Sequence, residues 1–226
     1  MSKKYTVKEI YYTLQGEGAH AGRPAVFCRF TGCNLWTGRE QDREKAICRF
    51  CDTDFIGTDG LNGGKYTAQE LAEKVRAVWE NTIVLTDIPI HKSDARHTMK
   101  GYVVCTGGEP ALQLDSDLIS ALHEQNMEVG IETNGTIELP EKIDWVCVSP
   151  KAGSNCIVTS GDELKLVFPQ VGAEPELFVH QNFKNFYLQP MDGAFQKINS
   201  DLAVQYCLAH PQWRLSVQTH KYLNIP

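Results

Sequence analysis

Short apolar runs rich in β-branched and aromatic residues recur along the chain, and glycine, proline or polar residues bound each of them. Apolar runs of this length and composition predict β-strands that are buried in a sheet. We expect strands over residues 25–30, 102–105, 128–132, 145–148, 164–168, 186–188 and 214–217.

Helical patterns stand between several of these runs. The first is marked by a capping box at Thr67 and Glu70, after which apolar residues follow at helical spacing. Strands that alternate with helices predict βα units and therefore a mostly parallel sheet. The predicted helices begin at residue 67, at residue 115 or 116 and near residues 199–201, and the last two end near residues 125–126 and before Pro211.

Polar segments rich in glycine and proline directly follow most of the predicted strands. The carboxyl ends of parallel strands meet at one edge of a sheet, and in barrels and open α/β sheets that edge binds ligands. A polar loop on its own is an ordinary feature, but several in step with a cysteine cluster predict a single site. The segments are residues 31–33, 106–110, 133–135, 149–151, 189–192 and 218–220.

Two segments interrupt the alternation of strands and helices. Residues 37–66 begin with a nearly all-polar stretch and contain four glycines between positions 57 and 64, so we interpret them as an insertion. Residues 86–100 are a second polar stretch. We predict a single domain over residues 1–226, in which residues 213–226 form a last strand and a tail that closes the site.

The composition is that of an ordinary soluble enzyme. The 226 residues are 42% hydrophobic and 22% charged, which allows one domain with a sizeable core. A net charge of −6 argues against duplex nucleic acid as a partner, since phosphate binding needs clustered lysine and arginine. No apolar run reaches the roughly 18 residues of a membrane span, and the first residues lack the apolar core of a secretory signal. We therefore expect a cytoplasmic protein that binds neither nucleic acid nor membrane.

Eight cysteines occur in the chain, and three of them have a spacing that suggests a cofactor. Cys33, Cys48 and Cys51 form a C-x14-C-x2-C pattern in a polar region. Without a secretion signal, the thiols are expected to stay reduced and to serve in metal binding or packing. The other cysteines are assigned to packing inside apolar strands (Cys28, Cys105 and Cys147) or receive no role (Cys156 and Cys207).

Three thiolates without a fourth ligand fit a [4Fe–4S] cluster better than a zinc ion. A structural zinc site needs four ligands, and His20 lies thirteen residues before Cys33 and across a predicted strand. A cluster held by three cysteines leaves one iron open, and S-adenosylmethionine (SAM) occupies that position in a large class of enzymes. A zinc site and unligated thiols are the two alternatives.

The motif Thr106-Gly107-Gly108-Glu109-Pro110 directly follows a predicted strand. Its two glycines allow a ligand to approach the backbone closely, and their carbonyl groups can accept from an ammonium group. After a cysteine cluster, this motif resembles the glycine-rich segment that binds the methionine amino group of SAM in radical SAM enzymes.

A series of segments in the same order resembles the 7-carboxy-7-deazaguanine synthase family of radical SAM enzymes. The likeness runs from about residue 8 to Pro226. The first cysteine gap departs from the usual C-x3-C-x2-C pattern of radical SAM enzymes, although this family is similar in including members with the expanded loop. The role of residues 34–47 stays open. The segments are residues 13–18, 24–29, 51–53, 106–110, 132–135, 149–151 and 189–192.

The resemblance implies a fold, a reaction and a set of cofactors. The fold would be a compact, incomplete (partial TIM-like) α/β barrel of about six parallel strands with few helices. The reaction would convert 6-carboxy-5,6,7,8-tetrahydropterin into 7-carboxy-7-deazaguanine with loss of ammonia, a step toward queuosine and related deazapurines. The cofactors would be a [4Fe–4S] cluster, SAM and Mg²⁺, with no catalytic residue beyond the cluster and SAM. Thr53 matches the family's metal-binding threonine and offers a hydroxyl oxygen to Mg²⁺.

The resemblance also assigns residues to ligands. Arg29 would pair with the carboxylate of the pterin, with a salt bridge to a neighbouring acid as the alternative. The terminal carboxylate of Pro226 would contact the pterin, with simple packing of the tail as the alternative. SAM would contact Phe50, Gly108, Ser149, Pro150, Lys151, Gln189, Pro190, Met191 and Asp192. The pterin would contact Leu14, Gln15, Gly16, Glu17, Arg29, Thr106, His220 and Pro226.

A homodimer and a flavodoxin-like or ferredoxin-like electron donor complete what the resemblance implies. Two other functions compete with this reading. A radical SAM activase that forms a glycyl radical on another protein would not explain residues 14–17 or Arg29. A non-catalytic, zinc-stabilised binding module would lack the brown colour and oxygen sensitivity of an iron–sulfur protein.

Overall fold

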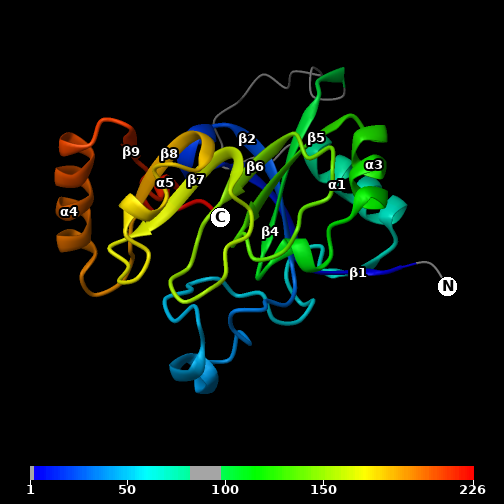
Figure 1. Ribbon diagram of the computed structural model, residues 1–226. Coiled ribbons are helices and arrows are strands. Elements are labelled where there is room, and N and C mark those ends of the chain that lie inside the picture. The colour runs from blue at the N-terminus through cyan, green and yellow to red at the C-terminus, as the bar shows by residue number, and fades with distance from the viewer. Residues whose placement is uncertain (1–2, 82–97) are drawn as a thin grey trace.

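The computed structural model describes residues 3–81 and 98–226, which form one curved sheet with the three longest described helices outside the curve (Figure 1). The strands are β1 (Tyr5–Leu14), β2 (Pro24–Phe30), β3 (Gly64–Tyr66), β4 (Gly101–Gly107), β5 (Met127–Thr133), β6 (Trp145–Val148), β7 (Ser160–Phe168), β8 (Asn182–Pro190) and β9 (Trp213–Leu215). The helices are α1 (Ala68–Glu80), α3 (Ser116–Glu124), α4 (Gln196–Ala209) and α5 (Thr219–Leu223).

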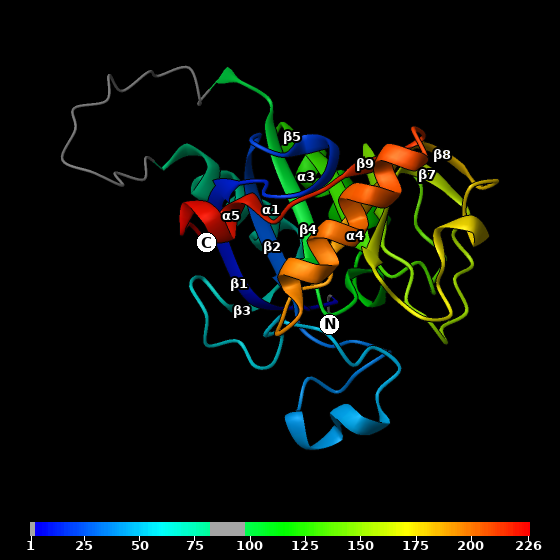
Figure 2. The same ribbon diagram turned by 90° about the vertical axis from the view of Figure 1, so that its left-hand side faces the viewer.

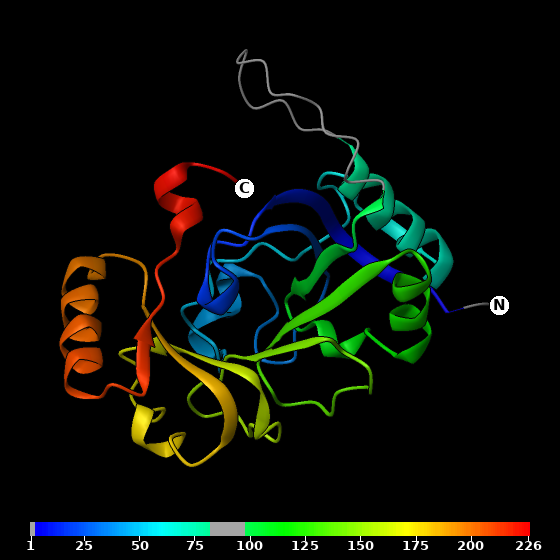
Figure 3. The same ribbon diagram turned by 90° about the horizontal axis from the view of Figure 1, so that it is seen from above.

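The direction of the strands confirms the expected α/β class. The strands stand in the order β3-β1-β2-β4-β5-β6-β7-β8-β9, and every neighbouring pair from β2 to β9 is parallel. The sheet curves but does not close, because β3 and β9 are its two free edges (Figure 3). With its few helices, this is the incomplete barrel that the family resemblance implies.

Two strands at one edge of the sheet are missing from the sequence prediction. β1 pairs antiparallel with β2 and with β3. The charged pair Lys8-Glu9 interrupts the apolar residues of β1, and a register shift between Val7 and Glu9 breaks its alternation, so the strand signal is weak. β3 exists only by pairing with β1, and it lies within residues 37–66, so the end of that segment belongs to the sheet.

The predicted parallel strands are all present, with some changes of bounds. β6 has the predicted limits, whereas β7 and β8 begin at residues 160 and 182 rather than 164 and 186. Their first residues are polar but pair with one another, as Ser160 does with Asn182. β9 begins at Trp213, one residue before the predicted start, and ends at Leu215, two residues before the predicted end.

A helix start can be predicted from the sequence where a local side chain caps it. At α1, the Thr67 hydroxyl accepts from the backbone N–H of Glu70, while the Glu70 carboxylate accepts from the N–H of Thr67, as the capping box predicts. Asp115 caps α3 by accepting from the N–H of Leu118 at 3.1 Å. α4 begins at Gln196, before the predicted start, and no side chain caps it, so no sequence signal marks that start.

Two hydrophobic clusters fill the space between the sheet and the helices. The first lies against α1 and α3, and the second lies against α4 on the other flank of the molecule (Figure 2, Figure 3). Cys28 and Cys105 belong to the first cluster and Cys147 is also buried, as their place in apolar strands predicts. Both clusters use the outward-facing side chains of the strands, while the inner face carries polar groups together with a smaller apolar cluster of Ala25, Tyr102 and Val104.

Residues 86–97 of the second polar stretch lie outside the described residues. Among the helices of residues 3–81 and 98–226, none combines the length and the apolar character that crossing a membrane requires.

Candidate active site

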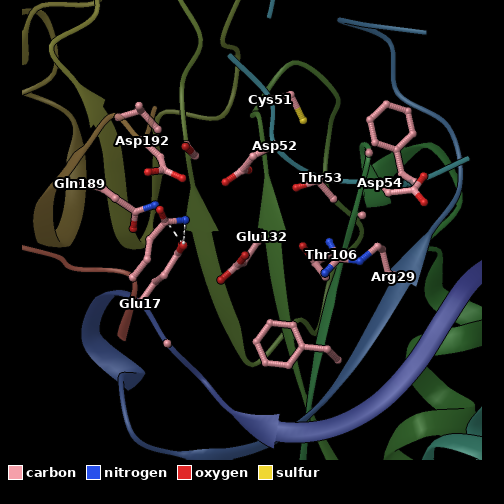
Figure 4. Close-up of a pocket in the computed structure, with 18 of the residues that line it drawn as sticks. Glu17, Arg29, Cys51, Asp52, Thr53, Asp54, Thr106, Glu132, Gln189 and Asp192 are labelled. Atoms are coloured by element: carbon pink, nitrogen blue, oxygen red, sulfur yellow. Dashed lines mark hydrogen bonds between the residues drawn. The ribbon is translucent and has the colours of Figure 1, made fainter. Parts of the chain in front are cut away.

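The loops at the carboxyl ends of the parallel strands surround a cavity of about 480 Å³. This volume lies within the usual range of ligand pockets. Cys51 and Asp52 reach the cavity from one side, and Glu17 and Glu132 face it from the other (Figure 4). The predicted site residues that line it are Leu14, Gln15, Gly16, Glu17, Arg29, Cys33, Cys48, Phe50, Cys51, Thr53, Thr106, Gly108, Ser149, Lys151, Gln189, Pro190, Met191, Asp192, His220 and Pro226. Pro150 is buried and does not line the cavity.

Strand alternation explains why charged groups reach the inside of the sheet. Successive side chains of a strand point to opposite faces. In β7, Leu164 and Leu166 pack in the cluster under α4, so Glu163 and Lys165 point inward. The same rule turns Thr106 of β4 toward the cavity.

The three cysteines of the C-x14-C-x2-C pattern lie along one wall. The Sγ atom of Cys33 accepts from the backbone N–H of Leu35 at 3.4 Å, and burial raises the pKa of this thiol. A hydrogen bond with the Cys48 thiol lowers the pKa of Cys51 to about 6. This shift favours the thiolate form of Cys51, which is the form that binds metals.

These thiols suit a multinuclear cluster better than a single metal ion. In the part of the chain that the structure describes, no group of three or more His, Cys, Asp or Glu side chains is arranged to hold a metal ion. Cys33, Cys48 and Cys51 all line the cavity, so three thiols are available there to ligands that bind sulfur. His20, the histidine that the sequence offers as a fourth zinc ligand, hydrogen-bonds the Tyr102 hydroxyl and does not line this cavity.

Glu109 of the glycine-rich motif joins two loops at the edge of the cavity. Its side chain is fully buried, and its carboxylate accepts from the Thr133 hydroxyl and from the N–H of Asn134, both at 2.7 Å. Burial raises its pKa, while these donors oppose that rise. At Gly108 a Cβ would lie 2.1 Å from the carbonyl oxygen of Gly32, so only glycine lets this loop approach the segment that carries Cys33.

The wall opposite the thiols contains a buried ionic network. The Lys165 ammonium, 6% exposed, lies 2.6 Å from Glu17 Oε2 and 3.3 Å from Glu132 Oε1. Burial by itself would lower the pKa of Lys165, but Glu132 and Glu17 raise it well above its usual value. Burial would raise the pKa of Glu17, but Lys165 lowers it to about 2. Two carboxyl groups face one ammonium, so this wall has an excess of acceptor oxygens.

Amide side chains hold this acidic wall in place. Gln189 and Gln218 donate to Glu17 Oε1 at 3.0 and 2.9 Å, and Figure 4 shows the first of these bonds. Gln15 donates to Glu132 Oε1 at 2.9 Å. The carboxylates are thus oriented before any ligand arrives, which lowers the cost of ordering them on binding.

Arg29 forms the salt bridge that the sequence leaves as an alternative. Its Nε donates to Glu9 at 2.8 Å, and its Nη2 donates to the Tyr11 hydroxyl at 2.9 Å. The side chain also lines the cavity, and its Nη1 forms no hydrogen bond with any residue that the structure describes. Arg29 is therefore paired and still has a donor to offer to a ligand.

Lys221 connects two acidic residues at the mouth of the cavity. Its ammonium lies 2.8 Å from Asp52 Oδ2 and 2.5 Å from Asp192 Oδ2. The hydrogen bond from Lys221 lowers the pKa of Asp192, the residue expected to contact SAM. A ligand that uses the Asp192 carboxylate must therefore share it with Lys221.

The C-terminal tail reaches the cavity through polar contacts. The Pro226 carbonyl oxygen accepts from the Thr13 hydroxyl at 2.8 Å. His220 lies against Gly16, where a Cβ would come within 2.2 Å of the His220 Nδ1 atom. Tyr222 is 72% exposed and Leu223 59%, so these two apolar side chains of the tail are not buried.

Several charged residues that line the cavity are absent from the sequence prediction, among them Lys165, Glu132 and Lys221. Lys165 stands inside an apolar strand, which is the same signal that singles out Arg29. Glu132 ends a predicted strand and opens one of the family segments, so it too had a signal. Lys221 had none, because its partners Asp52 and Asp192 are far from it along the chain.

Known proteins resemble this chain over nearly its whole length, although no protein-family model matches it. A protein named 7-carboxy-7-deazaguanine synthase from Caulobacter vibrioides is 60% identical over 223 residues, covering 98% of this chain and 99% of that protein. One of the same name from Bordetella pertussis is 57% identical with the same coverage. The crystal structure of QueE from Escherichia coli has a TM-score of 0.66 and 26% identity, covering 95% of this chain and 94% of that one. This chain therefore belongs to the 7-carboxy-7-deazaguanine synthase family of radical SAM enzymes.

Proposed function

We propose that this protein is a radical SAM lyase that converts 6-carboxy-5,6,7,8-tetrahydropterin into 7-carboxy-7-deazaguanine with loss of ammonia, in the biosynthesis of queuosine or related deazapurines. The observation that carries the proposal is one cavity with two unlike walls, one with three thiols and one with the Lys165–Glu17–Glu132 network. The names of the curated relatives support the same activity.

The thiol wall would hold the cluster and SAM, which supply the radical chemistry when bound. Cys33, Cys48 and Cys51 would ligate the cluster. SAM would lie between the cluster and the strand ends, where Gly108 brings only backbone to the cavity and Asp192 offers acceptor oxygens for hydroxyl groups. The remaining SAM contacts would come from Phe50, Ser149, Pro150, Lys151, Gln189, Pro190 and Met191.

The acidic wall would bind the pterin. The guanidine-like edge of the ring carries N–H donors, which suit the acceptor oxygens of Glu17 and Glu132. Arg29 would meet the 6-carboxylate with its free Nη1 donor, so the salt bridge to Glu9 and the contact to the substrate can coexist. The remaining contacts would come from Leu14, Gln15, Gly16, Thr106, His220 and Pro226.

We assign Mg²⁺ to Thr53, whose side chain lines the cavity beside Cys51 (Figure 4). One hydroxyl is a poor magnesium site, so oxygens of the substrate and water would complete the coordination. Thr53→Ala is expected to raise the Mg²⁺ concentration for half-maximal turnover by about tenfold, with cluster content and SAM binding unchanged. An unchanged Mg²⁺ dependence would place the metal elsewhere.

The same chemistry suggests an electron donor and a cellular compartment for the enzyme. Reduction of a [4Fe–4S] cluster needs an electron donor of low potential, such as a flavodoxin-like or ferredoxin-like protein. An enzyme with eight reduced cysteines suits a reducing, cytoplasmic compartment. We propose in addition that the active species is a homodimer that binds neither nucleic acid nor membrane.

An anaerobic assay tests the function directly. The reconstituted protein, with 6-carboxytetrahydropterin, SAM, Mg²⁺ and a reductant, is expected to release ammonia and 7-carboxy-7-deazaguanine, both measurable by mass spectrometry and an ammonia assay. Cleavage of SAM without this product would contradict the lyase and favour the glycyl-radical activase. A colourless protein without absorbance near about 400 nm would contradict the cluster itself and favour the binding module.

A further inference from the structure

The two ends of the expanded segment between Cys33 and Cys48 meet at one backbone carbonyl group. The Leu35 carbonyl oxygen accepts from the backbone N–H groups of Ile47 and Cys48, at 3.1 and 3.3 Å. The chain therefore leaves after Leu35 and returns to the same point at Cys48. This brings Cys48 next to the segment that follows Cys33, as the short cysteine gap of other radical SAM enzymes would. Residues 36–46 project away from the sheet as a separate lobe (Figure 1, Figure 2).

Arg43 connects this lobe to the backbone that carries the third cysteine. Its Nη1 donates to the carbonyl oxygens of Arg49 and Cys51, at 2.9 and 3.0 Å. Its Nε donates to the Glu40 carboxylate at 2.8 Å, which orients the planar guanidinium. A single side chain thus holds both ends of the segment from residue 49 to residue 51.

An aromatic contact fixes the guanidinium from one side. The Cζ atom of Arg43 lies 4.1 Å from the ring centroid of Trp36, within the range of a cation–π interaction. Trp36 is 7% exposed and belongs to a small apolar cluster with Ala46 and Phe55, against which Cys33 and Cys51 also pack. The lobe therefore has its own core, and that core touches two of the three thiol-bearing residues.

We propose that Arg43, stacked on Trp36, is a positioning residue that fixes the Cys51 backbone and places a positive charge beside the cluster. The proposal rests on the cluster assigned under the proposed function. A lysine cannot replace it, because an ammonium lacks the planar group that stacks on Trp36 while donating to two carbonyls. A charge at this point favours the more negative, reduced state of a cluster, since local charge and hydrogen bonds set its potential.

The test compares variants of the anaerobically reconstituted protein. In Arg43→Met we expect a more negative midpoint potential and, in air, loss of the cluster about tenfold faster than in the wild type. In Arg43→Lys we expect the same faster loss with a smaller shift in potential, since the charge stays but the planar contacts do not. Arg39→Met is the matched control, because Arg39 is exposed, lies in the same lobe and forms no side-chain hydrogen bond with the described residues.

The outcomes separate this inference from the proposed function. A wild type that takes up no cluster contradicts the proposed function. Cluster-loaded Arg43→Met with the potential and the air stability of Arg39→Met overturns the role of Arg43 and leaves the proposed function standing. Near-ultraviolet circular dichroism shows whether Arg43→Met is folded. If that variant folds poorly, Arg43→Lys decides: a wild-type potential and wild-type air stability in Arg43→Lys overturn the claim that the planar guanidinium is needed.

Discussion

The two walls of the cavity are built in opposite ways. In the acidic wall, Glu132 and Lys165 stand on the parallel strands β5 and β7, and side-chain bonds of 2.6–3.3 Å join them to Glu17 and its neighbours. In the thiol wall, the three cysteines stand on irregular backbone between β2 and β3. That backbone is held by the Leu35 carbonyl, by Arg43 and by a small apolar cluster.

Under the proposed function, this contrast would separate recognition of the pterin from binding of the cofactors. The strands fix the acidic wall before a ligand arrives, so its loss should appear in the stability of the whole fold. The thiol wall is held by backbone hydrogen bonds and one small apolar cluster, and under the proposed function it would gain further order from the iron–sulfur cluster, as structural metal sites commonly do. Mutations in the two walls should therefore fail in different assays.

The largest expected effect concerns the thiol wall. Cys33→Ala should abolish the cluster signal and SAM cleavage, because the two remaining thiolates are too few to hold a [4Fe–4S] cluster. The free energy of unfolding, measured in urea, should change little. Cys105→Ala, in the buried core of β4, is the matched control and should keep the cluster signal. Full cluster content in Cys33→Ala would contradict the assignment of Cys33 as a cluster ligand.

The second prediction removes the cation of the acidic wall. Lys165→Met should lower the unfolding free energy by about 3–5 kcal/mol, because it leaves two carboxyl groups facing each other without a buried partner. Lys184→Met is the control, since Lys184 lies as close to Asp162 (2.6 Å) but is 75% exposed, and it should cost less than about 1 kcal/mol. Equal losses in the two variants would show that burial does not distinguish the pairs.

The third prediction uses pH to test the ion pair between Glu17 and Lys165 in the same wall. The pKa of Glu17 falls from 4.5 to about 2 on folding, so its contribution to stability is fully present above about pH 4.5 and is lost as the pH falls toward 2. Glu17→Gln should therefore flatten the acid limb of the stability curve of cluster-free protein, measured by urea unfolding between these limits. The loss should be smaller than in Lys165→Met, because Lys165 keeps Glu132. Parallel curves for wild type and variant would contradict the low pKa.

The smallest predicted effect concerns the tail, which lies between the two walls. A short C-terminal extension should raise the apparent KM for the pterin by about tenfold, or about 1.4 kcal/mol, with SAM affinity little changed, because Pro226 lines the cavity beside Thr13. The same extension at the N-terminus is the control, since Lys3, near that end, contacts Gln113 and Asp115, and neither of these residues lines the cavity. Unaltered kinetics in the C-terminally extended enzyme would mean that the tail only packs there.

Local patterns in the sequence determined much of this protein. The apolar runs fixed the parallel strands, the capping box fixed the start of α1, and the polar segments after the strands marked the edge where the cavity lies. These signals are local because a strand or a helix start depends on residues close together along the chain. The three cysteines and the glycine-rich motif were visible for the same reason.

Only the tertiary structure decided which charged groups meet. Lys165 finds Glu17 across 148 residues and Glu132 across 33, and both pairings depend on the order of the strands and on the curvature of the sheet. Lys221 meets Asp52 and Asp192 only because the tail returns over the cavity. A side-chain pair of this kind forms where two backbones are brought together by packing elsewhere, and no pattern within either segment records its partner.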